Sequence, residues 1–245
     1  MTAIASPQNP RLKALRRLQT KRGRAASARF AAEGEDLVAA AERAGVAPVE
    51  GFRLAGSGLG GERFAEVEGP ILGAVSALGS GTRVIGVYEQ VWAARPLGPL
   101  CVYLHGVGDP GNVGTVLRSA HAFGASCVAL GPRCADPHSP KAVRASMGAI
   151  FAVPLARAAG PAELPGLRIA LSAGAPQELR DVLGEDDGEL TLLVGAEREG
   201  LPEEVVADCE RHARIPIAGD SLNAAMAATV ALYETTRDSS RVRAS

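Results

Sequence analysis

The sequence has few aromatic residues, and this shortage limits the kind of core it can build. Aromatic residues make up 4% of the 245 residues, with a single Trp, whereas hydrophobic residues make up 47%. The apolar mass is therefore Ala, Val and Leu, which suits a folded α/β protein and not a disordered chain. A chain of this length can bury a substantial core in one or two domains.

Cysteine, histidine and long apolar runs are also scarce. The four cysteines form no CxxC pair and the four histidines show no ligand spacing, so we expect no disulfide and no metal. No apolar run approaches the roughly 18–20 residues of a membrane span, and the N-terminus lacks an apolar signal core. We therefore expect a cytoplasmic protein with no membrane partner.

An overall excess of positive charge is absent, because 26 basic and 27 acidic residues leave a net charge of −1. A cationic field over the whole surface is therefore excluded. The basic residues instead gather at the start, where residues 1–32 contain eight Lys or Arg and no acid. Leu12, Leu15 and Leu18 have near-helical spacing there, which predicts a helix with one apolar edge and a basic remainder.

Such a basic face has two interpretations. It is a solvated surface, or it faces a nucleic-acid backbone and neutralises the phosphates without reading sequence. Arg144, in a later helical segment, is a further candidate for which a structural role is equally open. The candidate phosphate-binding residues are Arg11, Lys13, Arg16, Arg17, Arg22 and Arg144.

The pattern of elements divides the chain into a small α/β domain at 1–92, a linker at 93–99 with two Pro and one Gly, and a larger domain at 100–245. In the larger domain short apolar runs alternate with helical segments. This alternation predicts a parallel sheet covered by helices on both faces. The expected strands are 100–104, 126–131, 150–155, 167–173, 189–195 and 214–217, and the expected helices are 111–123, 139–147, 176–183, 202–209 and 222–236.

Ligands of such sheets bind beyond the carboxyl ends of the strands, so we expect the turns there to surround one crevice. These turns are 105–111, 132–138, 172–175, 195–201 and 218–221. The first contains a GxGxxG pattern, which by itself indicates a dinucleotide site. Pro110 stands where the helix of that site would already have begun, and Pro132 and Arg133 follow the next strand in place of a ribose-binding acid. A dinucleotide-dependent oxidoreductase is thus a disfavoured alternative.

Three separated stretches give a more specific signal. DPGNVGTVLRSAHAFGA (109–125), LLVGAEREGLP (192–202) and IPIAGDSLNAAMAATVALYE (215–234) resemble, in order and spacing, the three motifs of the SpoU/TrmH branch of the SPOUT methyltransferases. KAVRASMGAIF (141–151) is similar to the same family. The opening residues, with SPQNPRLKALRRL and FAAEG, resemble an L30e-like substrate-binding domain.

The resemblance implies a fold and an activity. It implies S-adenosyl-L-methionine-dependent methylation of an RNA ribose 2′-hydroxyl, a C-terminal trefoil knot and a homodimer. The L30e-like start favours ribosomal RNA over transfer RNA. Removal of residues 1–90 is then expected to leave a folded, donor-binding dimer that binds RNA weakly. A non-catalytic RNA-binding protein of the same fold is the alternative.

The motif residues have chemical types that suit methyl transfer, which needs an aligned donor and a stabilised oxygen nucleophile. Arg118 matches the motif's arginine. Because a guanidinium is effectively always protonated, charge stabilisation suits it better than a role as base. The candidate catalytic residues are Arg118, Asn112, Glu197, Ser221 and Asn223, and the candidate donor-binding residues are Gly195, Ile215, Leu222, Ser172, Ala173 and Gly200.

Structural roles stay open for several of these residues. Asn112 and Ser221 could satisfy backbone N–H groups at the starts of their helices. Glu197 could orient Arg118 or be a solvated acid. The last helix, with Leu222, Met226, Val230 and Tyr233 at helical spacing, is expected to be mostly core.

Overall fold

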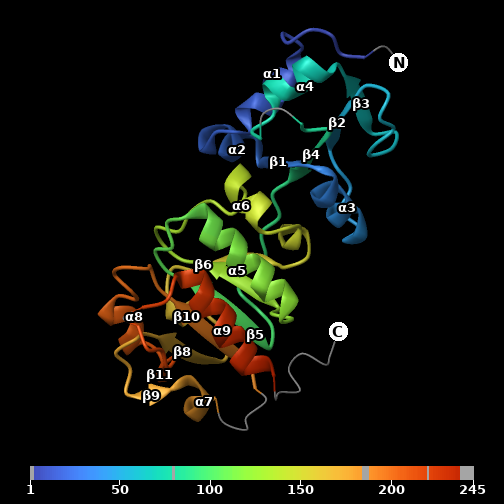
Figure 1. Cartoon of the computed structure of the whole chain (residues 1–245). Helices are drawn as coiled ribbons and strands as arrows, with labels where there is room; N and C mark the ends of the chain where they lie inside the picture. Colours follow the sequence, from blue (N-terminus) through green and yellow to red (C-terminus); the bar gives the residue numbers. More distant parts are fainter. Residues whose placement is uncertain (1–2, 79–80, 184–187, 220, 238–245) are drawn as a thin grey trace. The chain divides into compact units, whose positions relative to one another are not determined.

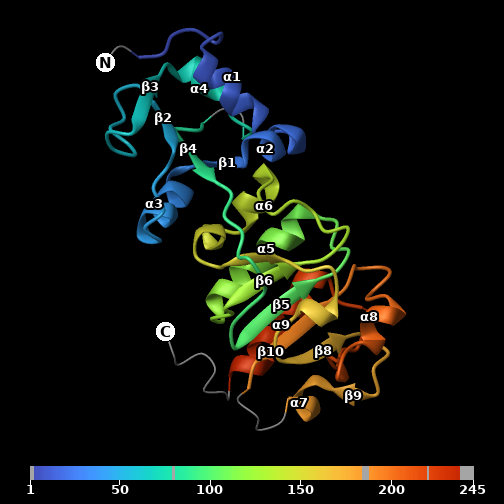
Figure 2. The ribbon, with the colours of Figure 1, turned by 180° about the vertical axis from the view of Figure 1, so that it is seen from behind.

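The computed structural model describes residues 3–78, 81–183, 188–219 and 221–237 (Figures 1 and 2). The chain forms two compact units, one from residues 1–90 with 136–151 and one from residues 91–135 with 152–245. The chain therefore passes from one unit to the other three times. The sequence assigned the whole of 100–245 to one domain, and it did not indicate that 136–151 packs with the first unit.

The first unit is built on a four-stranded sheet of order β1-β4-β2-β3, in which β4 is antiparallel to both neighbours and β2 is parallel to β3. Its elements are α1 (Pro10–Arg17), α2 (Lys21–Ser27), β1 (Arg29–Glu33), α3 (Glu35–Arg43), β2 (Glu50–Leu54), β3 (Phe64–Val67), α4 (Gly69–Val75), β4 (Val84–Glu89), α6 (Pro140–Ala145) and the 3-10 turn η1 (Ala149–Phe151). Leu12, Leu15 and Leu18 are buried against this sheet's core, which confirms the predicted apolar edge of the first helix.

Residues 136–151 belong to the first unit through an ion pair and a group of aromatic rings. The guanidinium of Arg24 lies 2.7 Å from the carboxylate of Asp136. The ring of Phe151 lies 4.7 Å from that of Tyr88 and 5.8 Å from that of Phe30, measured between centroids. Helix α6 packs along β1. The β6–β7 connection of the larger sheet is thus part of the first unit's core.

The second unit contains a seven-stranded parallel sheet of order β7-β6-β5-β10-β8-β11-β9, as the alternation of strands and helices predicted. Strands β5 and β10 at its centre are buried at every residue, because parallel strands are covered on both faces. Its elements are β5 (Leu100–Leu104), α5 (Pro110–Ala122), β6 (Cys127–Leu130), β7 (Leu155–Arg157), the 3-10 turn η2 (Pro161–Glu163), β8 (Leu167–Leu171), β9 (Gln177–Glu178), α7 (Leu179–Val182), β10 (Leu190–Val194), α8 (Glu203–Ala207), β11 (Arg211–Arg214) and α9 (Ala224–Thr236).

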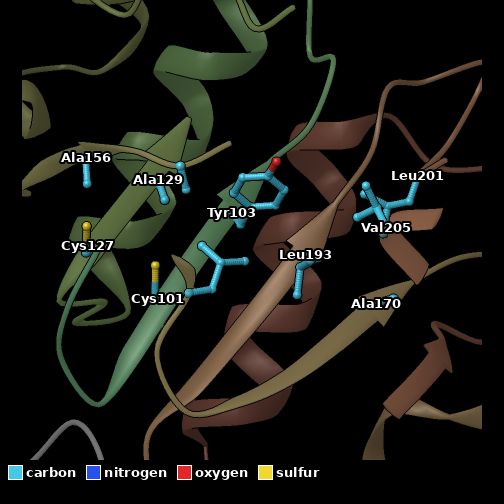
Figure 3. Packing of buried hydrophobic residues seen from close by; sticks show 11 residues of the cluster. Cys101, Tyr103, Cys127, Ala129, Ala156, Ala170, Leu193, Leu201 and Val205 are labelled. Carbon is cyan, nitrogen blue, oxygen red and sulfur yellow. The ribbon is translucent and has the colours of Figure 1, made fainter. Parts of the chain in front are cut away.

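Both faces of this sheet are covered. Helices α5 and α9 lie side by side on one face (Figures 1 and 2). On the other, Tyr103 of β5 and Leu193 of β10 pack with Val205 of α8, and Figure 3 shows this cluster together with Cys101 and Cys127. The two cysteines face each other across β5 and β6 as small apolar residues. Within the part of the chain that the structure describes, no helix is long and apolar enough to cross a membrane.

Two strand predictions are wrong in position. In the predicted strand 150–155, residues 149–151 form the turn η1, and the strand β7 begins only at Leu155, after Pro154. The predicted strand 214–217 is displaced to Arg211–Arg214. In both places a proline, which has no N–H to donate to a sheet ladder, stands inside the predicted strand. The other predicted helices differ from the observed ones by at most two residues at either end, apart from 176–183, where β9 precedes α7.

Candidate active site

A cavity of about 350 Å³ opens at the carboxyl ends of β8 and β10 in the second unit. Its walls come from three stretches that are far apart in the sequence, 171–174, 194–200 and 215–227. All six candidate donor-binding residues line it, namely Ser172, Ala173, Gly195, Gly200, Ile215 and Leu222. Turns 105–111 and 132–138 do not line this cavity, so the predicted crevice is built from fewer turns than expected. Asp220, in turn 218–221, lies outside the described residues.

One wall of the cavity is a tight loop whose shape requires two glycines. The loop is closed by hydrogen bonds of 2.9 Å and 3.2 Å between the backbones of Ala196 and Gly200. Gly200 has a φ of 69°, in the left-handed region that favours glycine. A side chain on Gly195 would place its Cβ 2.1 Å from the carbonyl carbon of Gly200. The loop can therefore fold back on itself only with glycine at 195.

The cavity combines an apolar wall with a charged rim. Leu171, Val194, Ile215 and Leu222 supply the apolar surface. Ile215 reaches the cavity because the chain leaves β11 at Arg214 and turns away from the sheet. Glu197, Arg198 and Glu199 are exposed at this rim, and Glu199 pairs with Arg133 at 3.4 Å, so the opening carries charges of both signs.

Three of the candidate catalytic residues form one hydrogen-bonded bridge beside the cavity. The Asn112 amide donates to the Glu197 carboxylate, and Asn223 Nδ2 donates to Asn112 Oδ1 at 3.2 Å. Asn223 Oδ1 in turn accepts from the backbone N–H groups of Ala225 at 2.9 Å and Met226 at 3.3 Å. The bridge therefore joins the start of α5, the glycine loop and the start of α9.

The helix caps differ from the structural roles that the sequence left open. Asn223, and not Ser221, is the N-cap of α9. Asp109, and not Asn112, is the N-cap of α5, accepting from the Asn112 N–H at 3.0 Å. Ser221 instead lines the cavity. The side chains of Asn112 and Ser221 are thus free of capping and face the candidate site.

Arg118 is exposed on α5 and does not line the cavity. Among the described residues Glu197 pairs with Asn112 and not with Arg118, so the expected orientation of Arg118 by Glu197 is not present.

Next to Arg118, the hydroxyl of Ser119 lies 2.6 Å from that of Thr229 on α9. No pattern in the sequence indicates this pair, because two hydroxyl residues more than a hundred positions apart form no recognisable motif.

Helix α9 presents an apolar face to solvent, contrary to the expectation that its large residues are core. Met226, Val230 and Tyr233 are 61%, 39% and 52% exposed. The buried face is formed mainly by small residues, namely Ala224, Ala225, Ala228, Ala231, Leu232 and Thr235. Because alanines allow close approach, they face the sheet and the larger side chains point outward.

The basic residues of the first unit separate into engaged and exposed groups. Arg11 pairs with Glu50 and its guanidinium lies 5.4 Å above the ring centre of Phe52. Arg16 is half-buried and donates to the carbonyl of Pro7 at 3.3 Å. The exposed candidates are Lys13, Arg17, Arg22 and Arg144.

A buried Tyr–His pair lies at the end of β5, just before the glycine-rich turn. The Tyr103 hydroxyl and His105 Nδ1 are 3.1 Å apart. Burial, with a smaller effect of Arg133, lowers the pKa of His105, so its imidazole is neutral at pH 7. Within the described residues, no group of three or more His, Cys, Asp or Glu side chains could hold a metal ion.

Sequence comparisons identify relatives of the whole chain and relatives that match about half of it. The model of the SpoU rRNA Methylase family matches residues 99–233. The chain is 30% identical over 264 residues to an uncharacterized tRNA/rRNA methyltransferase of Synechocystis, covering 97% of this chain and 94% of the relative. It is 39% identical over 141 residues to the 23S rRNA (uridine(2479)-2′-O)-methyltransferase of Streptomyces viridochromogenes, covering 53% of this chain and 49% of the relative. In this and several similar matches the chain spans about half the length of the relative.

Solved structures resemble the chain over nearly its full length. An AdoMet-bound rRNA methyltransferase from Sinorhizobium meliloti matches with a TM-score of 0.83 and 31% identity, covering 96% of this chain and 97% of the other. The SpoU methyltransferase AviRb from Streptomyces viridochromogenes matches with a TM-score of 0.80 and 26% identity, covering 94% and 97%. SpoU methyltransferases contain the trefoil knot, so the predicted fold is confirmed. The chain therefore belongs to the SpoU rRNA Methylase family of SPOUT methyltransferases, as its three motifs predicted.

Proposed function

We propose that this chain is an RNA methyltransferase that uses S-adenosyl-L-methionine to methylate a ribose 2′-hydroxyl, in ribosomal RNA rather than transfer RNA. The observation that carries the proposal is the convergence of six candidate donor-binding residues, from three distant stretches, on one cavity beside the Asn112–Glu197–Asn223 bridge. The family supports it, as does the Sinorhizobium meliloti relative, which is an AdoMet-bound rRNA methyltransferase.

The cavity has the chemistry that this donor requires. The apolar side chains of Leu171, Ile215 and Leu222 can cover the faces of an adenine ring, while neighbouring backbone groups bind its polar edge. The carboxylate of Glu197 at the opening attracts the positive charges of the donor, whereas Glu199 is paired with Arg133 and the neighbouring Arg198 adds positive charge. When bound, S-adenosyl-L-methionine supplies an electrophilic methyl group attached to a positively charged sulfur.

The acceptor side of the proposed reaction is assigned to Arg118. The ribose oxygen forms a bond to the methyl carbon while the carbon–sulfur bond breaks, and the hydroxyl proton leaves to solvent. A guanidinium stabilises the negative charge that develops on this oxygen and binds the adjacent phosphate in a bidentate manner. Arg118 is exposed and has no ion pair among the described residues, so it is available for an RNA substrate. Ser221 and the Asn112–Asn223 bridge are assigned to holding the ribose.

The first unit is proposed to hold the RNA. Lys13 and Arg17 on α1, with Arg22 on α2, present exposed positive charge without a nearby partner in the described chain. Arg11 contributes less, because Glu50 neutralises it. The likeness of this unit to L30e-type proteins stays a prediction, and so does the cytoplasmic location, which rests on the sequence.

We also propose that the chain acts as a homodimer. Met226, Val230 and Tyr233 form an exposed apolar row on α9. The row adjoins a mostly apolar cavity of about 190 Å³ lined by residues that include Leu179 and Pro216. A protruding apolar row beside an apolar hollow on one surface is suited to a two-fold interface with a second copy, which needs a self-complementary surface.

The alternatives predict different chemistry. A dinucleotide enzyme would hold pyrophosphate at the start of α5, but the N-cap there is the carboxylate of Asp109, which repels phosphate. A non-catalytic RNA-binding protein would not need a donor cavity. Calorimetric titration with S-adenosyl-L-methionine and with NAD distinguishes the proposed methyltransferase from a dinucleotide enzyme. We expect S-adenosyl-L-methionine to bind and NAD not to bind.

Labelled-methyl transfer tests the reaction itself. The full-length chain is incubated with labelled donor and with unmodified ribosomal and transfer RNA pools, and the modified ribose is then mapped. We expect incorporation into ribosomal RNA at a 2′-oxygen. Donor binding without incorporation into either pool would contradict the proposed function and favour the non-catalytic alternative.

A further inference from the structure

Helices α5 and α9 are joined by side-chain hydrogen bonds at two points. At one point Asn223 Nδ2 donates to Asn112 Oδ1, and at the other the hydroxyls of Ser119 and Thr229 are 2.6 Å apart. Residues 112 and 119 are two helical turns apart, about 10 Å along the axis, and therefore lie on one face of α5. These two side-chain hydrogen bonds, called ties below, lie on one face of α5 and prevent both rotation and sliding of α5 against α9.

The direction of the second tie follows from its proton count. Thr229 Oγ1 donates to the carbonyl of Ala225 at 2.7 Å. A hydroxyl has only one proton, so Thr229 must accept from Ser119, whose hydroxyl is the donor. Ser119 is 8% exposed, so water has little access to this bond. The tie is thus a specific, shielded hydrogen bond with a defined direction.

The two ties belong to one continuous network that ends at the cavity. From Thr229 the chain of bonds passes to the carbonyl of Ala225, whose N–H donates to Asn223. Asn223 donates to Asn112, which donates to Glu197 on the cavity wall. The position of α5 is therefore set relative to the donor cavity.

Arg118 immediately precedes Ser119 and is about 100° away around the helix, at the edge of the face that contacts α9. Its side chain makes no hydrogen bond among the described residues, so the packing of α5 alone sets the point from which the guanidinium reaches out. We propose that Ser119 and Thr229 are positioning residues that hold Arg118 in register with the donor cavity. This inference rests on the proposed function. A displacement of about 1 Å at a reacting group can cost about a hundredfold in rate.

The test compares near-isosteric changes at Thr229. Thr229→Val keeps the shape but removes the hydroxyl, whereas Thr229→Ser keeps the hydroxyl. The matched control is Thr236→Val on the same helix, because the Thr236 hydroxyl donates to the carbonyl of Leu232 at 2.8 Å in the same way but makes no tie to α5. The measured quantities are kcat for methyl transfer to RNA, the Kd for S-adenosyl-L-methionine and Tm, with rates measured well below the melting transition.

We expect Thr229→Val to lower kcat about tenfold or more while the donor Kd stays within about twofold, and Thr229→Ser and Thr236→Val to stay close to wild type. Ser119→Ala removes the same bond, so it should have a similar effect, and the double variant should be no worse than either single change. If the wild type is active and Thr229→Val has the same kcat, the inference is wrong and the proposed function stands. A loss of donor affinity and Tm in parallel with kcat also overturns it, because the role would then be structural. An inactive wild type overturns the proposed function and this inference together.

Discussion

The guanidinium of Arg24 lies 2.7 Å from the carboxylate of Asp136, although 112 positions separate the two residues in the sequence. Arg24 is 4% exposed and also donates to the carbonyl of Leu18 at 2.8 Å. This ion pair, in which Arg24 is buried and Asp136 is partly exposed, and the rings around Phe151 make residues 136–151 part of the first unit. The segment lies between β6 and β7 in the chain, so the two units share more than a simple linker.

This relationship changes the expected result of removing residues 1–90. The truncated chain loses the partners of residues 136–151, so the ring of Phe151 and the side chains of Val143 and Ile150, all largely buried in the intact chain, become exposed. We expect this truncation to melt at a lower temperature and to aggregate. Circular dichroism melting and light scattering measure both effects.

The matched variant carries the same truncation with residues 136–151 replaced by a flexible Gly/Ser linker of equal length. We expect this variant to be monodisperse and to bind S-adenosyl-L-methionine, because the cavity is built wholly from the second unit. Equal behaviour of the two truncated chains would show that the exposed segment is harmless.

Replacement of Arg118 tests the proposed acceptor side. Arg118→Ala should keep the donor Kd, since Arg118 does not line the cavity, and should lower kcat about 10²–10³-fold through lost charge stabilisation. The kcat of Arg118→Lys should lie between those of wild type and Arg118→Ala, because an ammonium keeps the charge but loses the bidentate geometry. Labelled-methyl transfer and calorimetry provide the two readouts. Unchanged turnover in Arg118→Ala would remove this residue from the mechanism.

Gly195→Ala tests the glycine loop. The added Cβ would lie 2.1 Å from the carbonyl carbon of Gly200, so the loop must open and we expect donor affinity to fall at least tenfold. Gly174 supplies the control, because it lines the same cavity and an added Cβ there meets nothing within 4 Å. Gly174→Ala should bind the donor nearly as wild type in calorimetry. Similar affinities for both variants would refute the requirement for glycine at 195.

Val230→Glu tests the proposed homodimer. A carboxylate in the middle of the apolar row on α9 would be costly to bury. We therefore expect the Kd for dissociation of the dimer to rise at least tenfold. Val49→Glu in the first unit is the control, because Val49 is 42% exposed and Val230 is 39% exposed. Analytical ultracentrifugation measures the association. A wild type that sediments as a monomer at all concentrations would contradict the proposed dimer.

The ion pair between Arg168 and Glu210 predicts a pH-dependent contribution to stability. Arg168 Nε lies 3.0 Å from the Glu210 carboxylate, and this hydrogen bond lowers the pKa of Glu210 to about 2. The unfolded chain has a pKa near the ordinary value of about 4.3, so the contribution is complete above that pH and is lost as the pH falls towards 2. Because the Glu210 side chain is 42% exposed, we expect at most about 1 kcal/mol.

Urea unfolding of Glu210→Gln measures this contribution. The midpoint should be lower than that of wild type at pH 7, and the difference should shrink between pH 4 and pH 3. Glu189→Gln, an exposed acid without an ion pair in the described chain, is the control and should show no such trend. A difference that is constant from pH 7 to pH 3 would assign the effect to packing and not to charge.

Much of the second unit could be predicted from local sequence. Strands such as Leu100–Leu104 and Leu190–Val194 are continuous apolar runs because both of their faces are covered, so burial and secondary structure give the same signal. The candidate donor-binding residues come from the motifs, and the order of parallel strands brings the turns that carry them to one edge of the sheet. The chemistry of the cavity was thus present in the sequence before its shape was known.

Other features required the tertiary structure, because apolar side chains do not specify what covers them. Ile150 and Phe151 were assigned to a strand, but they are covered by the first unit's own residues. Met226, Val230 and Tyr233 were assigned to the core, but the alanines of α9 pack more closely and take that place.

The sequence by itself determined the family, the parallel sheet and the residues of the cavity. Only the tertiary structure decided that Asn223 caps α9, that Asn112 joins it to Glu197, and that Ser119 meets Thr229. These relationships join residues that lie far apart in the sequence, and the packing of α5 on α9 brings them within hydrogen-bonding distance.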